Sequence, residues 1–345
     1  MSKDAAVPGG GSTAGKTSWV PLDTTVAHQA RMYDFLLGGK DNYAADRAAS
    51  EEMLKIYPEA AYSARANRAF LGRAVRYLAG QAGIRQFLDI GTGIPTAGNT
   101  HEVAQAIAPE SRVVYVDYDP VVLAHARALL TSNEEGATEY IDSDLRDTLA
   151  ILSQAAQLLD FTRPVAVTLL SILHAVPDAD GPQAIVAALM DAVPSGSYIA
   201  ISHAASDLIT PEALQGLYDS FQKVQQQFQW RTREQVAQFF AGTDLVEPGL
   251  VRVDDWRPEP GAGDTRKSAM WAAVGRKRLG GPGGDGDRRL PWGCPGTGWN
   301  GVLFHGTSGR APSGTAAGRS QVLATSTVRP EPAARSRHSI TSTTW

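Results

Sequence analysis

The segment FLDIGTGIPTAGN, from Phe87 to Asn99, decides the fold of this 345-residue chain. Its first residues have the apolar pattern of a buried strand, and a helical pattern follows it, which is the setting in which a glycine loop is informative. Gly91 and Gly93 have no Cβ, so the backbone can turn tightly and let a ligand approach its N–H groups at the start of the next helix. An ordinary turn is the alternative interpretation, and the residues described next favour a ligand site.

Strand-like runs alternate with helical patterns on both sides of this loop. Strands are predicted at 86–90, 112–117, 138–142, 164–173 and 197–203, and helices at 100–108, 120–131, 145–159 and 181–192. Such alternation builds a parallel sheet covered by helices on both faces, and ligands bind outside the carboxyl ends of its strands. Two further strands, at 244–253 and 268–274, are expected to close the sheet as an antiparallel pair.

Three helices are predicted ahead of the first strand, at 25–37, 44–56 and 59–82. Capping signals at Thr210 and Thr232 predict two more helices near the end of the series. We therefore divide the chain into a disordered leader (1–18), one domain (19–277) and a disordered Gly-, Pro- and Arg-rich tail (278–345). Within the domain, 19–83 is a helical prefix and 84–277 is the α/β core.

The composition bounds the kind of partner. With 43% hydrophobic and 20% charged residues, no apolar leader and a single cysteine, the chain is expected to be a soluble cytoplasmic protein that does not cross a membrane. Its net charge is −4, and the tail is basic, so the domain itself is strongly acidic. An acidic domain argues against nucleic-acid binding, which depends on neutralising phosphates, and favours a small-molecule partner.

Three carboxylates stand where a nucleotide-like ligand needs them. Asp117 ends the second strand, where a carboxylate can accept both hydroxyl hydrogens of a ribose. Asp144, beside the apolar Leu145, can hold an adenine amino group after the third strand. Asp89 precedes the glycines and can hold an ammonium group. We also assign Thr92 and Asp119 to this site, although Asp119 with Pro120 has the pattern of a helix cap.

Asp89 separates the two main ligand classes. The dinucleotide fingerprint has a third glycine where this chain has Thr96, and the negative charge of Asp89 would repel the pyrophosphate of a dinucleotide. S-adenosylmethionine has no phosphate and has a cationic amino-acid end, which suits carboxylates at 89, 117 and 144. An NAD(P)-dependent dehydrogenase stays as the weaker alternative, and so does a non-catalytic protein that only binds S-adenosylmethionine.

Longer motifs support the second ligand. The stretches ARMYDFLLGGKDNYAADR, ARANRAFLGRAVRYLA and FLDIGTGIPTAGNTHEVAQ together resemble the DUF574 family of bacterial S-adenosyl methyltransferases, over residues 19–277. The resemblance implies a Rossmann-like class I methyltransferase sheet of about seven strands, mostly parallel with an antiparallel last strand. It also implies cofactor contacts by Asp89, Gly91, Gly93, Asp117 and Asp144. Pro95 departs from the superfamily pattern, where many members place a third glycine.

The helical prefix holds polar residues around the Gly38-Gly39 break. One interpretation is a solvated helix face that ends in a turn. The other is a lid over the sheet edge, in which Lys40 or Arg31 pairs with the cofactor carboxylate and Tyr33 lines the acceptor pocket.

His174, after the fourth strand, is the candidate general base, because an imidazole there could take a proton from a hydroxyl or amine near neutral pH. A histidine that only packs at the strand end is the alternative. Methyl transfer from a sulfonium needs mainly alignment and exclusion of water, so we expect a largely positional mechanism acting on a small-molecule acceptor. The dispersed histidines and carboxylates have no metal-ligand spacing. The acceptor and the oligomeric state do not follow from the sequence.

Overall fold

The computed structural model of the chain describes residues 23–129, 132, 134–259 and 267–279. The predicted leader, and the tail from residue 280 on, lie outside the described residues. The described strands form one sheet in the order β3-β2-β1-β4-β5-β8-β6, and β7 pairs with β8 beside this path. Their bounds are β1 (Gln86–Ile90), β2 (Arg112–Asp117), β3 (Ala137–Asp142), β4 (Ala166–Leu170), β5 (Tyr198–Ala204), β6 (Thr243–Leu245), β7 (Val251–Arg252) and β8 (Met270–Lys277).

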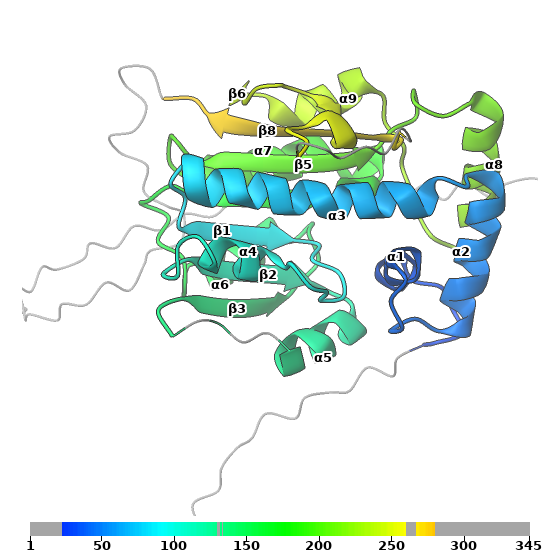
Figure 1. Ribbon diagram of the computed structural model, residues 1–345, viewed down its shortest axis with the longest axis horizontal. Coiled ribbons are helices and arrows are strands. Elements are labelled where there is room, and N and C mark those ends of the chain that lie inside the picture. Colours follow the sequence, from blue (N-terminus) through cyan, green and yellow to red (C-terminus); the bar gives the residue numbers. More distant parts are fainter. Residues whose placement is uncertain (1–22, 130–131, 133, 260–266, 280–345) are drawn as a thin grey trace, which may run out of the picture. The chain divides into compact units, whose positions relative to one another are not determined.

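The strand directions confirm the predicted fold class. Strands β1 to β5 pair in parallel, and β8 runs antiparallel to β5, β6 and β7. The arrows of β1, β2 and β3 point to the right in Figure 1, so the carboxyl ends of the parallel strands meet at that edge. The chain folds as an α/β protein with a mostly parallel sheet and an antiparallel last strand, as the sequence predicts.

Two helical layers cover the sheet and bury its apolar side chains. On one face lie α3 (Ala60–Arg76), the π-helical turn η1 (Tyr77–Gln81) and α4 (Thr100–Gln105), packed on the side chains of one alternate set of strand residues. On the other face lie α6 (Thr148–Ala155), α7 (Pro182–Ala192), α9 (Arg233–Ala237) and the short η4 (Gln238–Phe240). The central strands are buried on both faces, which is why their sequences are apolar without alternation.

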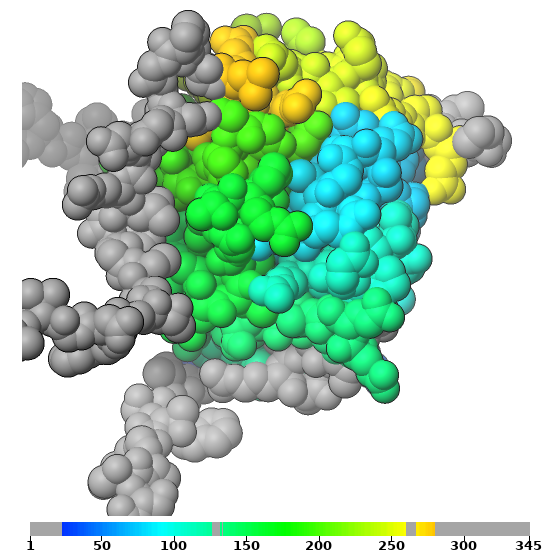
Figure 2. All heavy atoms as spheres, turned by 90° about the vertical axis from the view of Figure 1, so that its left-hand side faces the viewer, coloured from blue at the N-terminus to red at the C-terminus, as the bar shows by residue number. Residues whose placement is uncertain are grey.

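A third group of helices lies at the carboxyl ends of the strands. It comprises α1 (Gln29–Leu37), α2 (Ala44–Ile56) and α8 (Pro211–Lys223), whose apolar side chains share a separate core. Figure 1 shows these three helices gathered at one end of the sheet, with α5 (Pro120–Leu129) below them. Figure 2 views the opposite end, and the blue of α1 and α2 is not seen on that face. The helical prefix therefore stands over the sheet edge where ligands bind in folds of this kind.

Local backbone geometry explains where the predicted elements are wrong. The strand predicted at 164–173 ends at Leu170, because Ser171 has a φ of 55° and turns the chain into the 3-10 turns η2 (Leu173–Ala175) and η3 (Asp178–Asp180). The strand predicted at 244–253 is two strands, because Gly249 has a φ of 86° and breaks the ladder between them before η5 (Val253–Asp255).

Two predicted helices also begin several residues too early. The helix predicted from residue 145 begins at Thr148, where the Asp147 side chain accepts a hydrogen bond from the Ala150 amide and caps the first turn. The helix predicted from residue 25 begins at Gln29, because His28 is extended and caps α1. It ends where predicted, with Gly38 in the left-handed region at φ 82°.

Candidate active site

The glycine loop after β1 lies between the carboxyl ends of β1 and β2. Gly91 and Gly93 have φ values of 74° and 65°, which only glycine adopts without strain. A Cβ on Gly91 would lie 2.4 Å from Cγ1 of Ile172, so this turn also packs against the loop after β4. A Cβ on Gly93 would meet nothing within 4 Å, because that residue borders an open cavity. The loop therefore presents bare backbone to the cavity.

Asp89 lies at the end of β1 with both carboxylate oxygens held. Thr100 donates to Oδ2 and Thr168 donates to Oδ1, each at 2.6 Å. Burial raises the pKa of Asp89, and the two threonine hydrogen bonds oppose that rise. Each oxygen can accept one more hydrogen bond, so the carboxylate, which lines the cavity, has capacity left for a ligand ammonium group.

Asp117 joins the glycine loop to the next helix. Its Oδ2 accepts from the Gly93 amide at 2.9 Å, and its Oδ1 accepts from the amides of Tyr118 and Asp119 at 2.8 and 3.0 Å. Burial raises the pKa of this carboxyl, while the backbone hydrogen bonds act against the shift. The sequence predicts the carboxylate at this position, and the structure adds that it also shapes the loop.

A second cavity lies next to Asp117 and shares part of its wall with the first. Both cavities contact Gly91, Asp117, Tyr118 and Ile172. The second is also lined by Asp144 and Leu145, with the Asp144 carboxylate held by the Arg146 guanidinium at 2.9 Å. A ligand that reaches from Leu145 to Asp89 would thus follow one continuous path over the glycine loop.

The structure gives Asp119 a different role from the one predicted. Its Oδ1 accepts from the Val121 amide and caps α5, and its Oδ2 lies 2.6 Å from Nδ1 of His28. Burial works to raise the pKa of Asp119, but the His28 hydrogen bond and charge outweigh it and lower the pKa. Asp119 is not part of either cavity wall, and it ties the start of α1 to the loop after β2.

The two cations of the predicted lid do not reach the cavity. Arg31 is buried, its guanidinium donates to the Val26 carbonyl at 2.8 Å, and its Nε lies 3.3 Å from the Asp46 carboxylate. Lys40 is exposed beyond the end of α1. Neither residue contributes to the wall of the cavities. Arg31 therefore stabilises the prefix itself, and the structure does not support a role for either cation in holding a cofactor.

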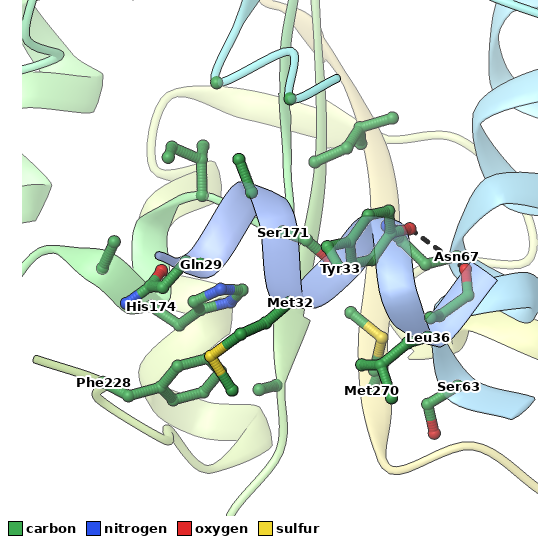
Figure 3. A pocket seen from close by; sticks show the side chains of 18 of the residues that line it. Gln29, Met32, Tyr33, Leu36, Ser63, Asn67, Ser171, His174, Phe228 and Met270 are labelled. Atoms are coloured by element: carbon green, nitrogen blue, oxygen red, sulfur yellow. Dashed lines mark hydrogen bonds between the residues drawn. The ribbon is translucent and has the colours of Figure 1, made fainter. Parts of the chain in front are cut away.

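Tyr33 and Thr92 do lie at the first cavity. The Tyr33 hydroxyl donates to the Ala64 carbonyl at 3.0 Å and accepts from the Asn67 side chain at 2.9 Å, as the dashed line in Figure 3 shows for the second bond. Burial raises the pKa of Tyr33, so the phenol stays protonated. Thr92 is paired with the Tyr140 hydroxyl at 2.7 Å.

Beyond the glycine loop the first cavity opens into what we call the apolar chamber. Its wall combines side chains from α1, α2, α8, β8 and the segments beside them: Met32, Leu36, Met53, Tyr57, Leu217, Phe221, Phe228, Trp230 and Met270. Figure 3 shows α1 crossing this space, with Met32 pointing toward Phe228 and Leu36 toward Met270. The whole cavity measures about 210 Å³. One water needs roughly 10–15 Å³ on this measure, so the space suits a small organic molecule.

His174 stands between the glycine loop and the apolar chamber, on the turn after β4. Its ring stacks on Phe228 with the centroids 4.0 Å apart, and its Nδ1 is buried without a hydrogen-bond partner among the described residues. Burial lowers the pKa of His174 well below its usual value, and the nearby His203 and Arg231 lower it further. The imidazole is therefore neutral near pH 7.

A buried cation behind His174 fixes this turn. Arg231 is fully buried and donates to the Leu173 and Val176 carbonyls, to the Asp178 carboxylate and to Nε2 of His203 at 2.7 to 2.9 Å. Because Nε2 of His203 accepts this bond, its Nδ1 carries the proton and donates to the Ala204 carbonyl at 2.8 Å. Burial lowers the pKa of His203 to about 3, and Arg231 contributes to this shift.

Several residues that reasoning from sequence missed also belong to the site. Tyr118 keeps 53% of its surface exposed at the border of the two cavities, and Gln29 contacts both cavities from α1. Ser171, at the strained turn after β4, has a buried hydroxyl without a partner in the described part of the chain. The aromatic residue directly after the predicted ribose carboxylate was a readable signal for Tyr118. Nothing in the sequence indicated Gln29 or Ser171.

Comparison with known proteins identifies the class. Residues 16–278 match the family described as S-adenosyl methyltransferase. A crystal structure of a DUF574 family protein from Streptomyces avermitilis MA-4680 is 45% identical, with a TM-score of 0.72 over 74% of this chain and 99% of that one. The chain belongs to the S-adenosyl methyltransferase family. A putative methyltransferase from Thermobifida fusca YX is 40% identical, with a TM-score of 0.68 over 74% of this chain and 97% of that one. No match was found among curated proteins.

The cofactor of this methyltransferase is S-adenosylmethionine, as the sequence predicts. The residues present fit it, because a carboxylate with free acceptor capacity, a glycine that opens on space and the Asp117 carboxylate follow one another along the joined cavities. The family match confirms the cofactor and sets aside the dehydrogenase alternative. The individual contacts of Asp89, Gly91, Thr92, Gly93, Asp117, Asp144 and Leu145 stay predictions.

Two properties of the described residues complete the picture. None of their helices combines the length and the apolar character that crossing a bilayer would require. Within the same residues, no group of three or more His, Cys, Asp or Glu side chains is placed to hold a metal ion.

Proposed function

We propose that this methyltransferase transfers a methyl group by in-line displacement to a small molecule that lies in the apolar chamber. The observation that carries the proposal is the continuity of the first cavity, which runs from Asp89 and Gly93 past His174 to the side chains of α1, α2 and α8. A cofactor on the glycine loop and an acceptor in the chamber would meet beside His174. The rate then comes mainly from alignment and exclusion of water.

The cofactor supplies a methyl carbon on a sulfonium sulfur, and the bond from this carbon to sulfur breaks, with the electron pair going to sulfur, as its bond to the acceptor forms. Asp117 and Asp144 would hold the nucleoside part, and Asp89 the amino group. Helix α1 excludes water from above, because Gln29, Met32 and Tyr33 cover the cavity. The neutral His174 would take the proton of the acceptor and release it to water.

Tyr33 acts as a positioning residue in this proposal. Its hydroxyl is held by both Ala64 and Asn67, so the ring is fixed as a wall between the glycine loop and the chamber. A Tyr33→Phe variant keeps the ring and loses only these two bonds, and we expect it to keep most activity. This expectation distinguishes a wall from a proton donor.

The test uses the full chain. Calorimetric titration with S-adenosylmethionine and S-adenosylhomocysteine measures cofactor binding, and incubation with labelled cofactor and a varied panel of acceptors measures turnover. We expect micromolar binding and formation of S-adenosylhomocysteine that depends on an added acceptor. Binding without turnover over the whole panel would contradict the proposal and favour the non-catalytic regulator that the sequence left open.

A further inference from the structure

The wall of the apolar chamber carries no charge. Among the described residues that line it, those from α1, α2 and α8 are apolar or aromatic except for the uncharged Gln29, and His174 is neutral. Asp89 and Asp117 lie at the glycine loop, and the Arg68 guanidinium is turned to that loop, where it donates to the Asn99 side chain at 2.8 Å. An ionised acceptor would leave water for a place without a counter-charge, which is costly. The chamber therefore favours an acceptor whose buried part is uncharged.

The shape of the wall suits a flat ring. Phe228 stacks on His174 on one side and lies 4.2 Å from Trp230 on the other, measured between ring centroids. The thioether of Met32 points toward Phe228, and Met270 lies next to Leu36, on the other side of Met32 from Phe228 (Figure 3). Aromatic faces and polarisable methionine sulfur make favourable contacts with an aromatic ligand.

Two buried polar atoms in the described wall of the chamber lack a hydrogen-bond partner, and both lie on the turn after β4. The Tyr57 hydroxyl is paired with Ser63 at 2.8 Å and accepts from the Ala269 amide, and Tyr33 is held by Ala64 and Asn67. By contrast, His174 Nδ1 and Ser171 Oγ are buried without hydrogen-bond partners among the residues that the structure describes. Both residues belong to the turn after β4, whose strained Ser171 has a φ of 55°. A ligand here has one polar end and an apolar body.

We infer that the acceptor is an uncharged aromatic hydroxyl compound, with its ring in the apolar chamber and its hydroxyl facing His174 and Ser171. The inference rests on the proposed function and names its substrate class. An imidazole with a lowered pKa is a weak base, so it takes a proton far more easily from an aromatic hydroxyl, which ionises near pH 10, than from an aliphatic one. The hydroxyl oxygen is then the nucleophile, and an aromatic methyl ether is the product.

Three probes with the same ring system test the class. They are 2-naphthol, naphthalene-2-methanol and 2-naphthoate, titrated by calorimetry into the full chain loaded with S-adenosylhomocysteine. We expect 2-naphthol to bind at least about tenfold more tightly than 2-naphthoate, because only 2-naphthoate would bury a negative charge in the chamber. With S-adenosylmethionine, mass spectrometry is expected to show 2-methoxynaphthalene and no methyl ether of naphthalene-2-methanol.

A pair of variants ties the binding to the chamber. Phe228→Leu keeps an apolar side chain and removes the stacked ring, so we expect 2-naphthol binding to weaken by about fivefold or more while S-adenosylhomocysteine binding is unchanged. Phe161→Leu is the control, because Phe161 packs against a different hydrophobic core and does not line the cavity. Unchanged cofactor binding also shows that each variant is folded.

The outcomes separate the two proposals. Equal binding of 2-naphthoate and 2-naphthol, or methylation of charged or aliphatic acceptors while 2-naphthol neither binds nor reacts, would overturn the substrate class and leave the methyl transfer standing. Absence of S-adenosylhomocysteine formation with every acceptor tried would overturn the proposed function itself.

Discussion

The two halves of the cavity are built from different kinds of sequence. The cofactor half consists of strand ends, and its key groups are fixed by short local hydrogen bonds, such as those from the amides of Gly93, Tyr118 and Asp119 to Asp117. The acceptor half consists of helix faces and loops from widely separated parts of the chain. Few polar atoms of its described wall lack a hydrogen-bond partner. One half binds by directed hydrogen bonds, and the other by shape and the exclusion of water.

The largest effect is expected where the two halves meet. Arg231→Met removes the buried cation that holds the turn carrying His174 and leaves the Leu173 and Val176 carbonyls without a donor. We expect the free energy of unfolding to fall by about 3–5 kcal/mol, measured by urea denaturation. Arg278→Met, which breaks an exposed pair with Asp244, serves as the control and should change little. Similar stability of both variants would show that Arg231 is not the anchor of the turn.

The cofactor half can be broken selectively at Asp117. Asp117→Asn replaces an acceptor with an amide beside three backbone donors, so S-adenosylhomocysteine affinity should fall by about 30-fold, or about 2 kcal/mol. Asp142→Asn is a matched control, because Asp142 is the exposed register partner of Asp117 on β3 and lines neither cavity. Binding of 2-naphthol should be nearly unchanged in both. If the two variants lose cofactor to the same degree, the proposed ribose contact is wrong.

The buried histidines give a pH dependence with a defined sign. His203 has a pKa of about 3 in the folded chain and an ordinary value near 6.5 when unfolded, so between these values only the unfolded state binds the proton. This group's contribution to stability is therefore complete above pH 6.5 and decreases as the pH falls, by up to about 1.4 kcal/mol per pH unit. Denaturation of the wild type and a His203→Gln variant at several pH values measures it. A difference between the two proteins that does not change with pH would contradict the assignment.

The smallest effect on affinity is expected at Tyr118, on the border between the cofactor half and the acceptor half of the cavity. Tyr118 stands half-exposed over the second cavity, next to Asp117, where its ring could cover an adenine. We expect Tyr118→Ala to weaken S-adenosylhomocysteine binding about fivefold, and Tyr118→Phe to have no effect. Calorimetry distinguishes the two, and weakening by both variants would mean that the hydroxyl matters instead of the ring.

The same contrast explains how much the sequence reveals. The bounds of β1 and β2 are predicted to the residue, because an apolar run that stops at an acid or a glycine is a local signal. The carboxylates at 89, 117 and 144 are predicted at the cavities for the same reason, since each lies at the end of a strand or within two residues of it. The end of β4 at Leu170 has no such signal, because the sequence does not show the positive φ of Ser171 or the hydrogen bond from its amide to Ser202 on β5.

The acceptor half was predicted only in outline. The prefix does cover the sheet edge, and Tyr33 and His174 do line the cavity. Arg31, however, is paired with Asp46 on the following helix, a contact that depends on how α1 and α2 pack and that no pattern in the sequence shows. The neutral state of His174 likewise depends first on burial, to which the stacked Phe228 contributes, and then on His203 and Arg231, and all three residues lie further along the chain.

The place in the sequence of part of the chamber wall has a consequence for comparisons within the family. Met32, Leu36, Met53, Tyr57 and Ser63 come from one continuous stretch that precedes the first strand, whereas the carboxylates and the cofactor loop lie in that strand or after it. Substitutions in that stretch can therefore alter the choice of acceptor while leaving the handling of the methyl donor intact. Overall identity between two relatives is then a poor guide to shared chemistry, and identity at the residues that line the chamber, within 29–64 and within 217–270, is the better measure of whether they modify the same compound.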